Sequence, residues 1–177
     1  MVGDHDQIDP ILQQIGFFDW NVEQDRGRSF AEGVAHLCAL HPGHAHLIRA
    51  YDERWHETVP GVIEGSVAIL EKLRAKHVPL YAITNFSREK WAESLVRFPF
   101  LGQFRDVVVS AHERLVKPDA AIYRLFLARN GLSGSQCVFI DDSWKNIVAA
   151  RQAGMQAVHF TGAEALAEEL RLMGLAV

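Results

Sequence analysis

The amino-acid sequence predicts an α/β protein in which a parallel β-sheet is flanked by helices and preceded by a small helical domain. From Val78 onward, short runs rich in β-branched residues alternate with segments whose apolar residues recur at helical spacing, and this alternation is typical of βαβ units. Before Val78 the apolar residues follow only the helical period. With 177 residues, 49% of them hydrophobic, the chain can bury a full core.

The β-branched runs predict four strands, at residues 78–83, 106–110, 137–140 and 157–160. Helical faces lie between them, formed by Trp91, Leu95 and Phe98 and by Ile122, Leu125 and Phe126, and a third helical pattern with Ile147, Ala150 and Arg151 follows the third strand. Pro118 suits the first turn of the second of these helices, and Gly131 and Gly154 are placed to end the second and the third. A last helix, residues 163–173, is expected to pack its apolar face on the sheet.

The amino-terminal part has helix signals and no convincing strand. Ser29 and Glu32 have the spacing of a capping box, and a second helical pattern runs through Leu47, Tyr51 and Trp55. Pro60 and Gly61 then interrupt the chain. We therefore expect a helical accessory domain over residues 1–59 and a sheet-containing core over residues 60–177.

Composition excludes several classes of partner and location. The formal net charge of −4, with no run of Lys or Arg, gives no reason to expect a nucleic-acid partner, although it does not exclude a small phosphorylated ligand. Cys38 and Cys137 lie in apolar runs and are expected to be reduced thiols. The sequence contains neither a signal-peptide pattern nor an apolar run long enough to span a bilayer, so we expect no membrane association and a cytoplasmic location.

Polar pairs follow three of the predicted strands. They are Thr84-Asn85, Lys117-Pro118 and Asp141-Asp142. Each pair alone has an ordinary explanation, because turns and helix caps favour the same residue types. Open α/β sheets bind their ligands at the carboxyl ends of the strands, and three such pairs in succession predict a site there.

The segments that contain these pairs, YAITNFS, LVKPDAAIY and VFIDDSWKNIVAAR, resemble the second, third and fourth motifs of the haloacid dehalogenase superfamily. They are most similar to the subfamily that contains sugar-phosphate phosphatases and the amino-terminal phosphatase domain of soluble epoxide hydrolase. WNVEQDRGRSF and VPGVIEG are similar to the helical cap of that subfamily and to its return linker. The resemblance implies a Rossmann-like core with a small helical cap.

The resemblance also implies a role for each residue of the pairs. Thr84 and the Asn85 amide would donate hydrogen bonds to a phosphoryl group, and Lys117 would place a positive charge beside it. Asp142 would be the principal ligand of Mg, assisted by Asp141 directly or through a metal-bound water. The implied activity is Mg-dependent hydrolysis of a small phosphorylated metabolite, such as a sugar phosphate, through an aspartyl-phosphate.

The first motif of the superfamily, an apolar strand that ends in the nucleophilic aspartate, has no match in this sequence. The aspartates ahead of the cap region follow no β-branched run; they are Asp4, Asp6, Asp9 and Asp19. We therefore expect no phosphatase turnover by these 177 residues alone. Either the start was assigned too far downstream, or the shorter chain is real and something outside it takes the place of the strand. In the superfamily that strand is central, so its absence would leave two sheet edges facing a gap, with low stability or pairing to a second chain.

Three other functions compete with a phosphatase, and the histidines raise a separate question of a zinc site. A haloacid dehalogenase is one alternative, although the acidic pair Asp141-Asp142 disfavours it, and a non-catalytic phosphate-binding protein is another. A phospho-receiver domain has its acidic pair first and its lysine last, which is not the order found here. The histidines His36, His41, His44 and His46 fit a solvated turn between helices better than a zinc site. Substrate identity and oligomeric state stay open.

Overall fold

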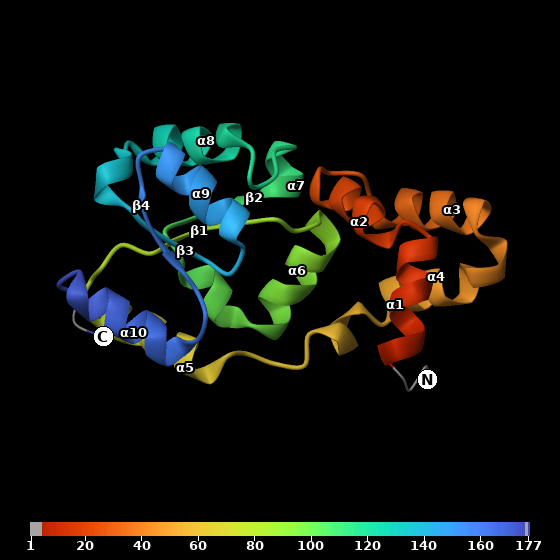
Figure 1. Cartoon of the computed structure of the whole chain (residues 1–177), viewed down its shortest axis with the longest axis horizontal. Helices are drawn as coiled ribbons and strands as arrows, with labels where there is room; N and C mark the ends of the chain where they lie inside the picture. Colours follow the sequence, from red (N-terminus) through yellow and green to blue (C-terminus); the bar gives the residue numbers. More distant parts are fainter. Residues whose placement is uncertain (1–4, 176) are drawn as a thin grey trace.

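A computed structural model describes residues 5–175 and 177. The predicted α/β class is confirmed, because helices surround short parallel strands (Figure 1). The molecule has two parts, which we call the helical lobe (residues 5–58) and the core lobe (residues 64–175). An extended segment, residues 59–63, connects them.

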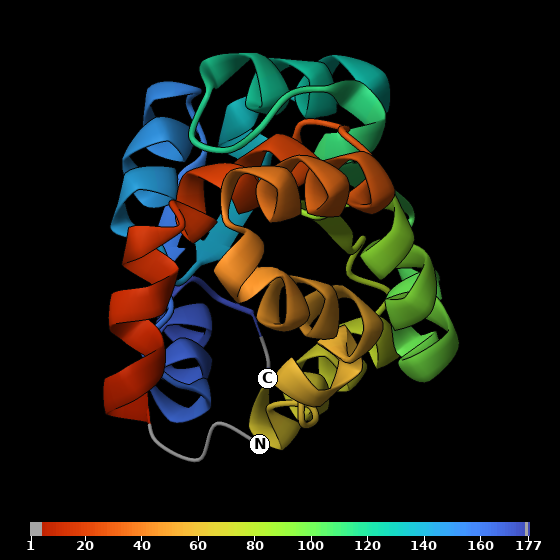
Figure 2. The ribbon, with the colours of Figure 1, turned by 90° about the vertical axis from the view of Figure 1, so that its right-hand side faces the viewer.

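The helical lobe surrounds a cluster of buried apolar side chains of its own. Its elements, in order, are α1 (His5–Gln14), α2 (Phe17–Asp25), α3 (Phe30–Leu40), η1 (Pro42–His44), α4 (Ala45–Glu53) and η2 (Trp55–Thr58). The capping box at Ser29 and Glu32 is confirmed and begins α3. Trp20 packs edge-on against Phe30, and its Nε1–H donates to the Gly33 carbonyl at 2.7 Å. Figure 2 shows these helices stacked against one another at one end of the molecule.

The core lobe alternates helices with strands as the sequence predicted. Its elements, in order, are α5 (Glu64–Ala75), β1 (Tyr81–Thr84), α6 (Arg88–Arg97), η3 (Pro99–Gln103), β2 (Asp106–Val109), α7 (Ser110–Glu113), α8 (Ala120–Asn130), η4 (Gly134–Gln136), β3 (Val138–Asp141), α9 (Trp144–Gln152), β4 (Gln156–His159) and α10 (Ala163–Leu172). Gly131 ends α8 in the left-handed conformation, as predicted, whereas Pro118 precedes the N-cap Asp119 and is not in the first turn. The Asp119 carboxylate accepts from the Ala121 amide and so provides the cap.

The predicted strand bounds need small corrections. The strand predicted to begin at Val78 begins at Tyr81, because the Val78 amide donates to Leu73 at the end of α5 and so belongs to the turn that ends this helix. The strand predicted to reach Ser110 ends one residue earlier, where α7 begins. The other two strands are each displaced by one residue, and Asp141 is the last residue of β3.

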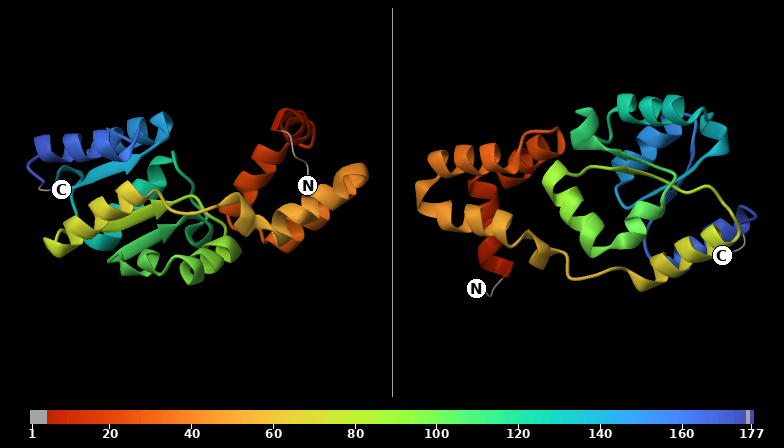
Figure 3. Two further views of the ribbon diagram at one scale, coloured as in Figure 1. Left: turned by 90° about the horizontal axis from the view of Figure 1, so that it is seen from below. Right: turned by 180° about the vertical axis from the view of Figure 1, so that it is seen from behind.

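The strands form two separate sheets of two strands each. β1 pairs in parallel with β2, and β3 pairs in parallel with β4. β1 and β3 face each other, but no backbone ladder joins them. Helices α8 and α9 cover one face of the strands, and α5 and α10 cover the other (Figures 1 and 3).

A large cavity lies between the two small sheets. Its volume is about 550 Å³, and its lining comes from β1, β3 and the covering helices. Apolar side chains dominate the lining, among them Leu73, Ile83, Phe126, Phe139, Ile140 and Leu170. The core is therefore packed around β2 and β4 and is open between β1 and β3.

Candidate active site

Asn85 connects the loop after β1 to the segment that follows α7. Its side-chain Nδ2–H donates to the Lys117 carbonyl at 3.0 Å, and its Oδ1 accepts from the Lys117 amide at 2.8 Å. The two residues are 32 positions apart in the sequence. Both ends of the Asn85 side-chain amide are therefore used to hold Lys117 in place.

Lys117 in turn makes an ion pair with Asp141. Its Nζ lies 2.6 Å from Asp141 Oδ2, with the lysine side chain 12% exposed and the aspartate side chain 5% exposed. Asp141 Oδ1 accepts from the Ser143 amide at 2.8 Å and from Asn146 Nδ2 at 2.9 Å. Burial alone would raise the pKa of Asp141, but the hydrogen bond and charge of Lys117, followed by the contacts of Ser143 and Asn146, hold that pKa below its usual value.

The two remaining predicted site residues lie next to this network in the sequence. Thr84 is the last residue of β1 and stands opposite Val109 of β2. Asp142 directly follows β3 and is exposed, while its carbonyl contacts His159 Nε2 at 2.8 Å. The structure thus brings Asn85, Lys117 and Asp141 into one chain of contacts at the carboxyl ends of the strands, and Thr84 and Asp142 adjoin it in sequence.

The donors at this edge limit which metal could bind. Among the side chains that the structure describes, no group of three or more His, Cys, Asp or Glu is positioned to hold a metal ion. Both carboxylate oxygens of Asp141 accept hydrogen bonds, whereas the Asp142 side chain makes none with the described residues. One free carboxylate, with water and a substrate phosphate, matches the needs of Mg²⁺ better than those of a structural zinc ion.

The aspartates weighed as nucleophiles do not join the network. Asp19 is exposed in the first turn of α2. Asp4 lies outside the described residues, and Asp6 and Asp9 lie in the part of α1 whose side chains are not described. Asp141 and Asp142 are the carboxylates at the carboxyl end of β3.

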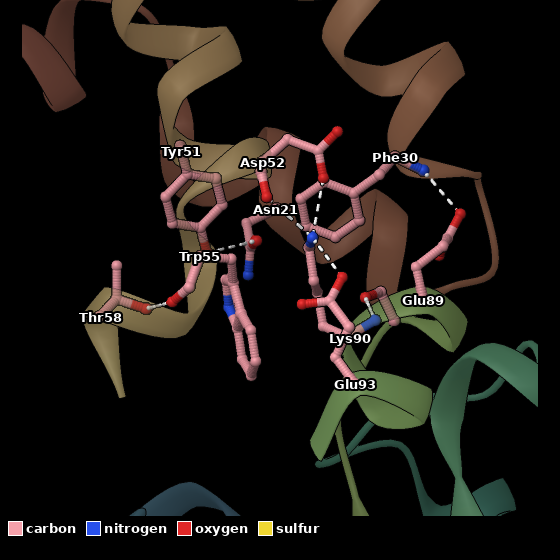
Figure 4. Close-up of polar contacts among 10 residues, drawn as sticks. Asn21, Phe30, Tyr51, Asp52, Trp55, Thr58, Glu89, Lys90 and Glu93 are labelled. Atoms are coloured by element: carbon pink, nitrogen blue, oxygen red, sulfur yellow. Dashed lines mark hydrogen bonds and ion pairs between the residues drawn. The ribbon is translucent and has the colours of Figure 1, made fainter. Parts of the chain in front are cut away.

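Helix α6, which begins just after Asn85, holds the helical lobe against the core lobe (Figure 4). Lys90 of α6 is 4% exposed, and its Nζ lies 2.9 Å from Asp52 Oδ1 and 2.8 Å from Glu93 Oε1. The Asp52 carbonyl also accepts from Nζ at 2.9 Å, and the Phe30 ring lies 4.9 Å away. Burial disfavours the charged form of Lys90, but the two carboxylates outweigh burial and raise its pKa.

A second contact places the helical lobe beside the predicted phosphate-binding loop. The Trp55 ring packs edge-on against Phe86, with ring centroids 5.7 Å apart, and Phe86 directly follows Asn85. Phe86 is fixed from the core side, because its amide donates to Ser110 Oγ at 2.9 Å. The Glu89 carboxylate accepts from the first amide of α3 at 3.0 Å. The helical lobe therefore covers the edge of the sheet at which the polar pairs lie.

Sequence reasoning did not find Lys90 or Asp25. The Asp25 carboxylate is half-buried at the end of α2, and burial raises its pKa to about 6. Burial, and then the negative charge of Asp25, raise the pKa of Tyr51 to about 12, although a hydrogen bond with Trp55 acts in the opposite direction and lowers it. Tyr51 also donates to Asn21 Oδ1 at 3.4 Å (Figure 4). No sequence signal marks Asp25, because its burial depends on side chains distant in the chain.

Comparison with known proteins identifies the family. A model of haloacid dehalogenase-like hydrolases matches residues 26–160. The chain therefore belongs to the haloacid dehalogenase-like hydrolase family, and the resemblance predicted from the motifs is confirmed. No helix in the described part of the chain is long and apolar enough to cross a membrane.

Two proteins with sequences similar to this chain are named as phosphatases. Validoxylamine A 7'-phosphate phosphatase from Streptomyces hygroscopicus subsp. limoneus is 28% identical over 80% of this chain and 70% of its own length. Sesquiterpene phosphatase astK from Aspergillus oryzae is 29% identical over 59% of this chain. The chain spans 53% of the length of that second relative.

A solved structure shares the fold. HAD family enzyme bt-2542 from Bacteroides thetaiotaomicron superposes with a TM-score of 0.73, covering 94% of this chain and 83% of that one at 21% identity. The same enzyme has been crystallised with magnesium and inorganic phosphate, and this form superposes with a TM-score of 0.68 over 79% of this chain and 73% of that one, also at 21% identity. At this level of identity the match shows the fold alone.

Proposed function

We propose that this chain is the greater part of a Mg-dependent phosphatase that acts on a small phosphorylated metabolite, with a sugar phosphate as the first class to test. The observation that carries the proposal is the network of Asn85, Lys117 and Asp141 at the carboxyl ends of the strands. The phosphatase names of two relatives and the phosphate and magnesium in a neighbouring structure support it.

Thr84 and each residue of the network have a physical role in this proposal. The Thr84 hydroxyl and the Asn85 main-chain N–H donate to phosphoryl oxygens, because the Asn85 side chain is already used on Lys117. Lys117 supplies a compact positive charge that offsets charge gathering on the transferring phosphoryl group. Asp141 positions that lysine, since its Oδ2 accepts directly from Lys117 Nζ.

Asp142 is the residue that would hold Mg²⁺. Its exposed carboxylate makes no hydrogen bond within the described residues, whereas Asp141 has both oxygens engaged. A bound Mg²⁺ would offset phosphate charge and keep several waters, a mode of binding that needs only one or two protein carboxylates. Asp141 and the Asn146 amide would hold the loop that presents Asp142.

These residues alone are proposed to bind phosphate without hydrolysing it. The carboxylates described at the strand ends are engaged with Lys117 or assigned to the cation, so neither is free to attack phosphorus. Removing the nucleophile from a covalent mechanism leaves only the acceleration due to binding and electrostatics. A non-catalytic phosphate-binding protein is thus the behaviour expected of residues 1–177 by themselves.

Binding of inorganic phosphate to the full chain, measured by calorimetry with and without Mg²⁺, tests this proposal. Lys117→Met should weaken phosphate binding at least about tenfold, because it removes the charge that faces the anion. Asp142→Asn should remove the dependence on Mg²⁺ while leaving weak binding in its absence. The matched control is Lys145→Met, an exposed lysine on α9, which should leave binding unchanged. Phosphate binding that is insensitive to Lys117→Met would contradict the site, and binding equally strong in excess chelator would contradict the role of Mg²⁺.

A further inference from the structure

The indole ring of Trp144 lies at the edge of the strands that carries the candidate active site. β3 ends at Asp141, and α9 begins with Trp144, so the amino-terminal end of α9 lies at the carboxyl edge of the strands (Figure 1). The Trp144 side chain is 55% exposed, whereas Trp20, Trp55 and Trp91 are buried. A single exposed apolar side chain is ordinary by itself, so the position and the contacts of this ring decide its role.

Contacts with His159 connect this ring to the residue that would hold the cation. His159 stands opposite Asp141 in the parallel register of β3 and β4. Its Nε2 lies 2.8 Å from the Asp142 carbonyl oxygen, and its ring meets the Trp144 ring edge-on, with ring centroids 5.5 Å apart. The Trp144 ring is therefore linked through His159 to the main chain of Asp142.

Arg151 supports the same ring from one of its faces. The guanidinium carbon of Arg151 lies 5.4 Å from the centroid of the Trp144 ring, and its Nη2–H donates to the Ala157 carbonyl of β4 at 2.9 Å. Because the guanidinium is hydrogen-bonded to the strand, the ring rests on a positive charge that is itself held in place. The rest of the indole surface is open to solvent, since more than half of the side chain is exposed.

A ring that is exposed, fixed and next to an anion site is suited to contact the organic part of a bound phosphate ester. A side chain that is held before binding loses little conformational entropy when a ligand packs on it. A phosphoryl group held by Lys117 and Asp142 tethers the organic part of the same molecule, so contact with Trp144 needs no second association event. Val148, one turn later on α9, is also exposed and extends the apolar surface.

We propose that Trp144 is a specificity-determining residue, which selects phosphate monoesters whose organic part is a ring with an apolar face, either aromatic or a sugar. The phosphoryl group occupies the strand ends, and the ring of the substrate packs on the open face of the indole. His159 and Arg151 act through Trp144 and are positioning residues. This inference rests on the proposed function, because the bound phosphoryl group provides the anchor, and it adds the class of substrate.

Binding of three phosphate esters to the full chain, with Mg²⁺ present, tests this inference. The probes are phenyl phosphate, glucose phosphorylated on its primary hydroxyl, and glycerol phosphate, which has no ring. At least one of the two ring esters should bind about threefold or more tightly than glycerol phosphate, as measured by calorimetry. The same ester should shield tryptophan fluorescence from the quencher acrylamide, because Trp144 is the exposed member of the four tryptophans. The ester that is preferred shows which kind of ring the site takes.

Substitutions at Trp144 separate the ring contact from folding. Trp144→Ala should lower the affinity for the preferred ring ester to that for glycerol phosphate, while the affinity for glycerol phosphate and the melting temperature stay nearly unchanged because the side chain is exposed. Trp144→Phe should restore most of the preference, since it keeps an aromatic face. The matched control is Leu172→Ala, which removes an exposed apolar side chain from α10 and should leave the preference intact.

The possible failures of this inference and of the proposed function can be told apart. Equal affinity for ring esters and glycerol phosphate, or a preference that survives Trp144→Ala, overturns the role of Trp144 and leaves the phosphate site standing. Phenol tests the anchor: if phenol alone shields Trp144 as strongly as phenyl phosphate does, the ring contact is independent of the phosphate site and the inference is wrong. If none of the three esters binds, the proposed function is contradicted, and the anchored ring contact is contradicted with it.

Discussion

The helical lobe and the core lobe differ in how their main-chain hydrogen bonds and apolar side chains are satisfied. In the helical lobe, α1 to α4 close their main-chain hydrogen bonds within themselves and bury Ile15, Trp20, Phe30, Leu37 and Ile48 in one cluster. In the core lobe, β1 and β3 depend on adjacent strands and stand beside a cavity. A helix closes its main-chain hydrogen bonds internally and needs only a packed face, whereas a strand takes its hydrogen-bond partners from neighbouring strands, and this difference explains why the cavity lies beside strands and not among the helices of the helical lobe.

The largest expected effect comes from removing the central side chain of the helical lobe, which tests whether this lobe unfolds independently of the core lobe. Trp20→Ala should destabilise the lobe by about 3–5 kcal/mol, because it deletes a 5% exposed ring and its hydrogen bond to Gly33. If the helical lobe is complete in itself, hydrogen exchange should accelerate in α2, α3 and α4 but not in β4. Acceleration throughout the chain would show that the lobes form one cooperative unit.

Trp144 provides the matched control for this substitution. Its side chain is 55% exposed on the core lobe, beside His159. Trp144→Ala should change the free energy of unfolding by no more than about 0.5 kcal/mol. A loss of stability as large as that caused by Trp20→Ala would mean that burial of the side chain does not determine how much a Trp→Ala substitution destabilises the chain.

The local features of the fold could be predicted from the sequence, because a few neighbouring residues determine them. The capping box at Ser29 and the left-handed end of α8 at Gly131 depend on residues within one turn. The strand bounds were less accurate, because Val78 to Leu80 have strand propensity but the end of α5 uses the Val78 amide for its turn. Propensity cannot show which of two hydrogen-bond partners a residue takes.

The residues in and around the candidate site also differ in whether the sequence could predict them. Asn85, Lys117 and Asp141 could be predicted, because each lies at or beyond the carboxyl end of a strand and parallel strands bring such positions to one edge. Lys90 could not, because its contact with the Asp52 main chain joins positions 38 apart and requires the packing of two lobes. A buried lysine has the same sequence signature as a lysine on the exposed face of a helix.

The contact between the lobes offers a second test. Lys90→Met should destabilise the chain by about 1–3 kcal/mol, less than a fully buried ion pair, because Asp52 and Glu93 remain partly exposed and can be solvated. The amides of α4 should exchange faster, and cleavage by a protease should increase in residues 59–63. Asp52→Asn should reproduce part of the effect, whereas Glu93→Gln should not increase cleavage, because Glu93 belongs to the same helix as Lys90.

Lys145→Met is the control for loss of a lysine, since Lys145 is exposed on α9. It should leave protease sensitivity unchanged. If Lys90→Met also leaves the sensitivity of residues 59–63 unchanged, the ion pair does not hold the lobes together and Trp55 against Phe86 is the remaining candidate.

The smallest expected effect is the dependence on pH that Asp25 gives to the stability of the folded chain. Asp25 is the last residue of α2, and its half-buried carboxylate has a pKa raised by burial from 3.8 to about 6. A carboxyl whose pKa is higher in the folded state binds more protons there than when unfolded, so stability falls as pH rises from about 4 to about 6 and is constant above. The negative charge also meets the carbonyl end of the helix, which disfavours it further.

Asp25→Asn removes this charge with little change in shape. At pH 7 the variant should be more stable than the parent by about 1 kcal/mol, a value reduced from the full shift because the carboxyl is partly solvated. At pH 3 the two should be nearly equal, since that pH lies below both the ordinary pKa of 3.8 and the raised pKa, and Asp25 is mostly protonated in both states. Glu23→Gln, an exposed carboxylate on the same helix, is the control and should change stability by less than about 0.5 kcal/mol at either pH. Urea unfolding at the two pH values measures the difference. Equal stability of parent and Asp25→Asn at pH 7 would mean that burial of this charge does not destabilise the helical lobe.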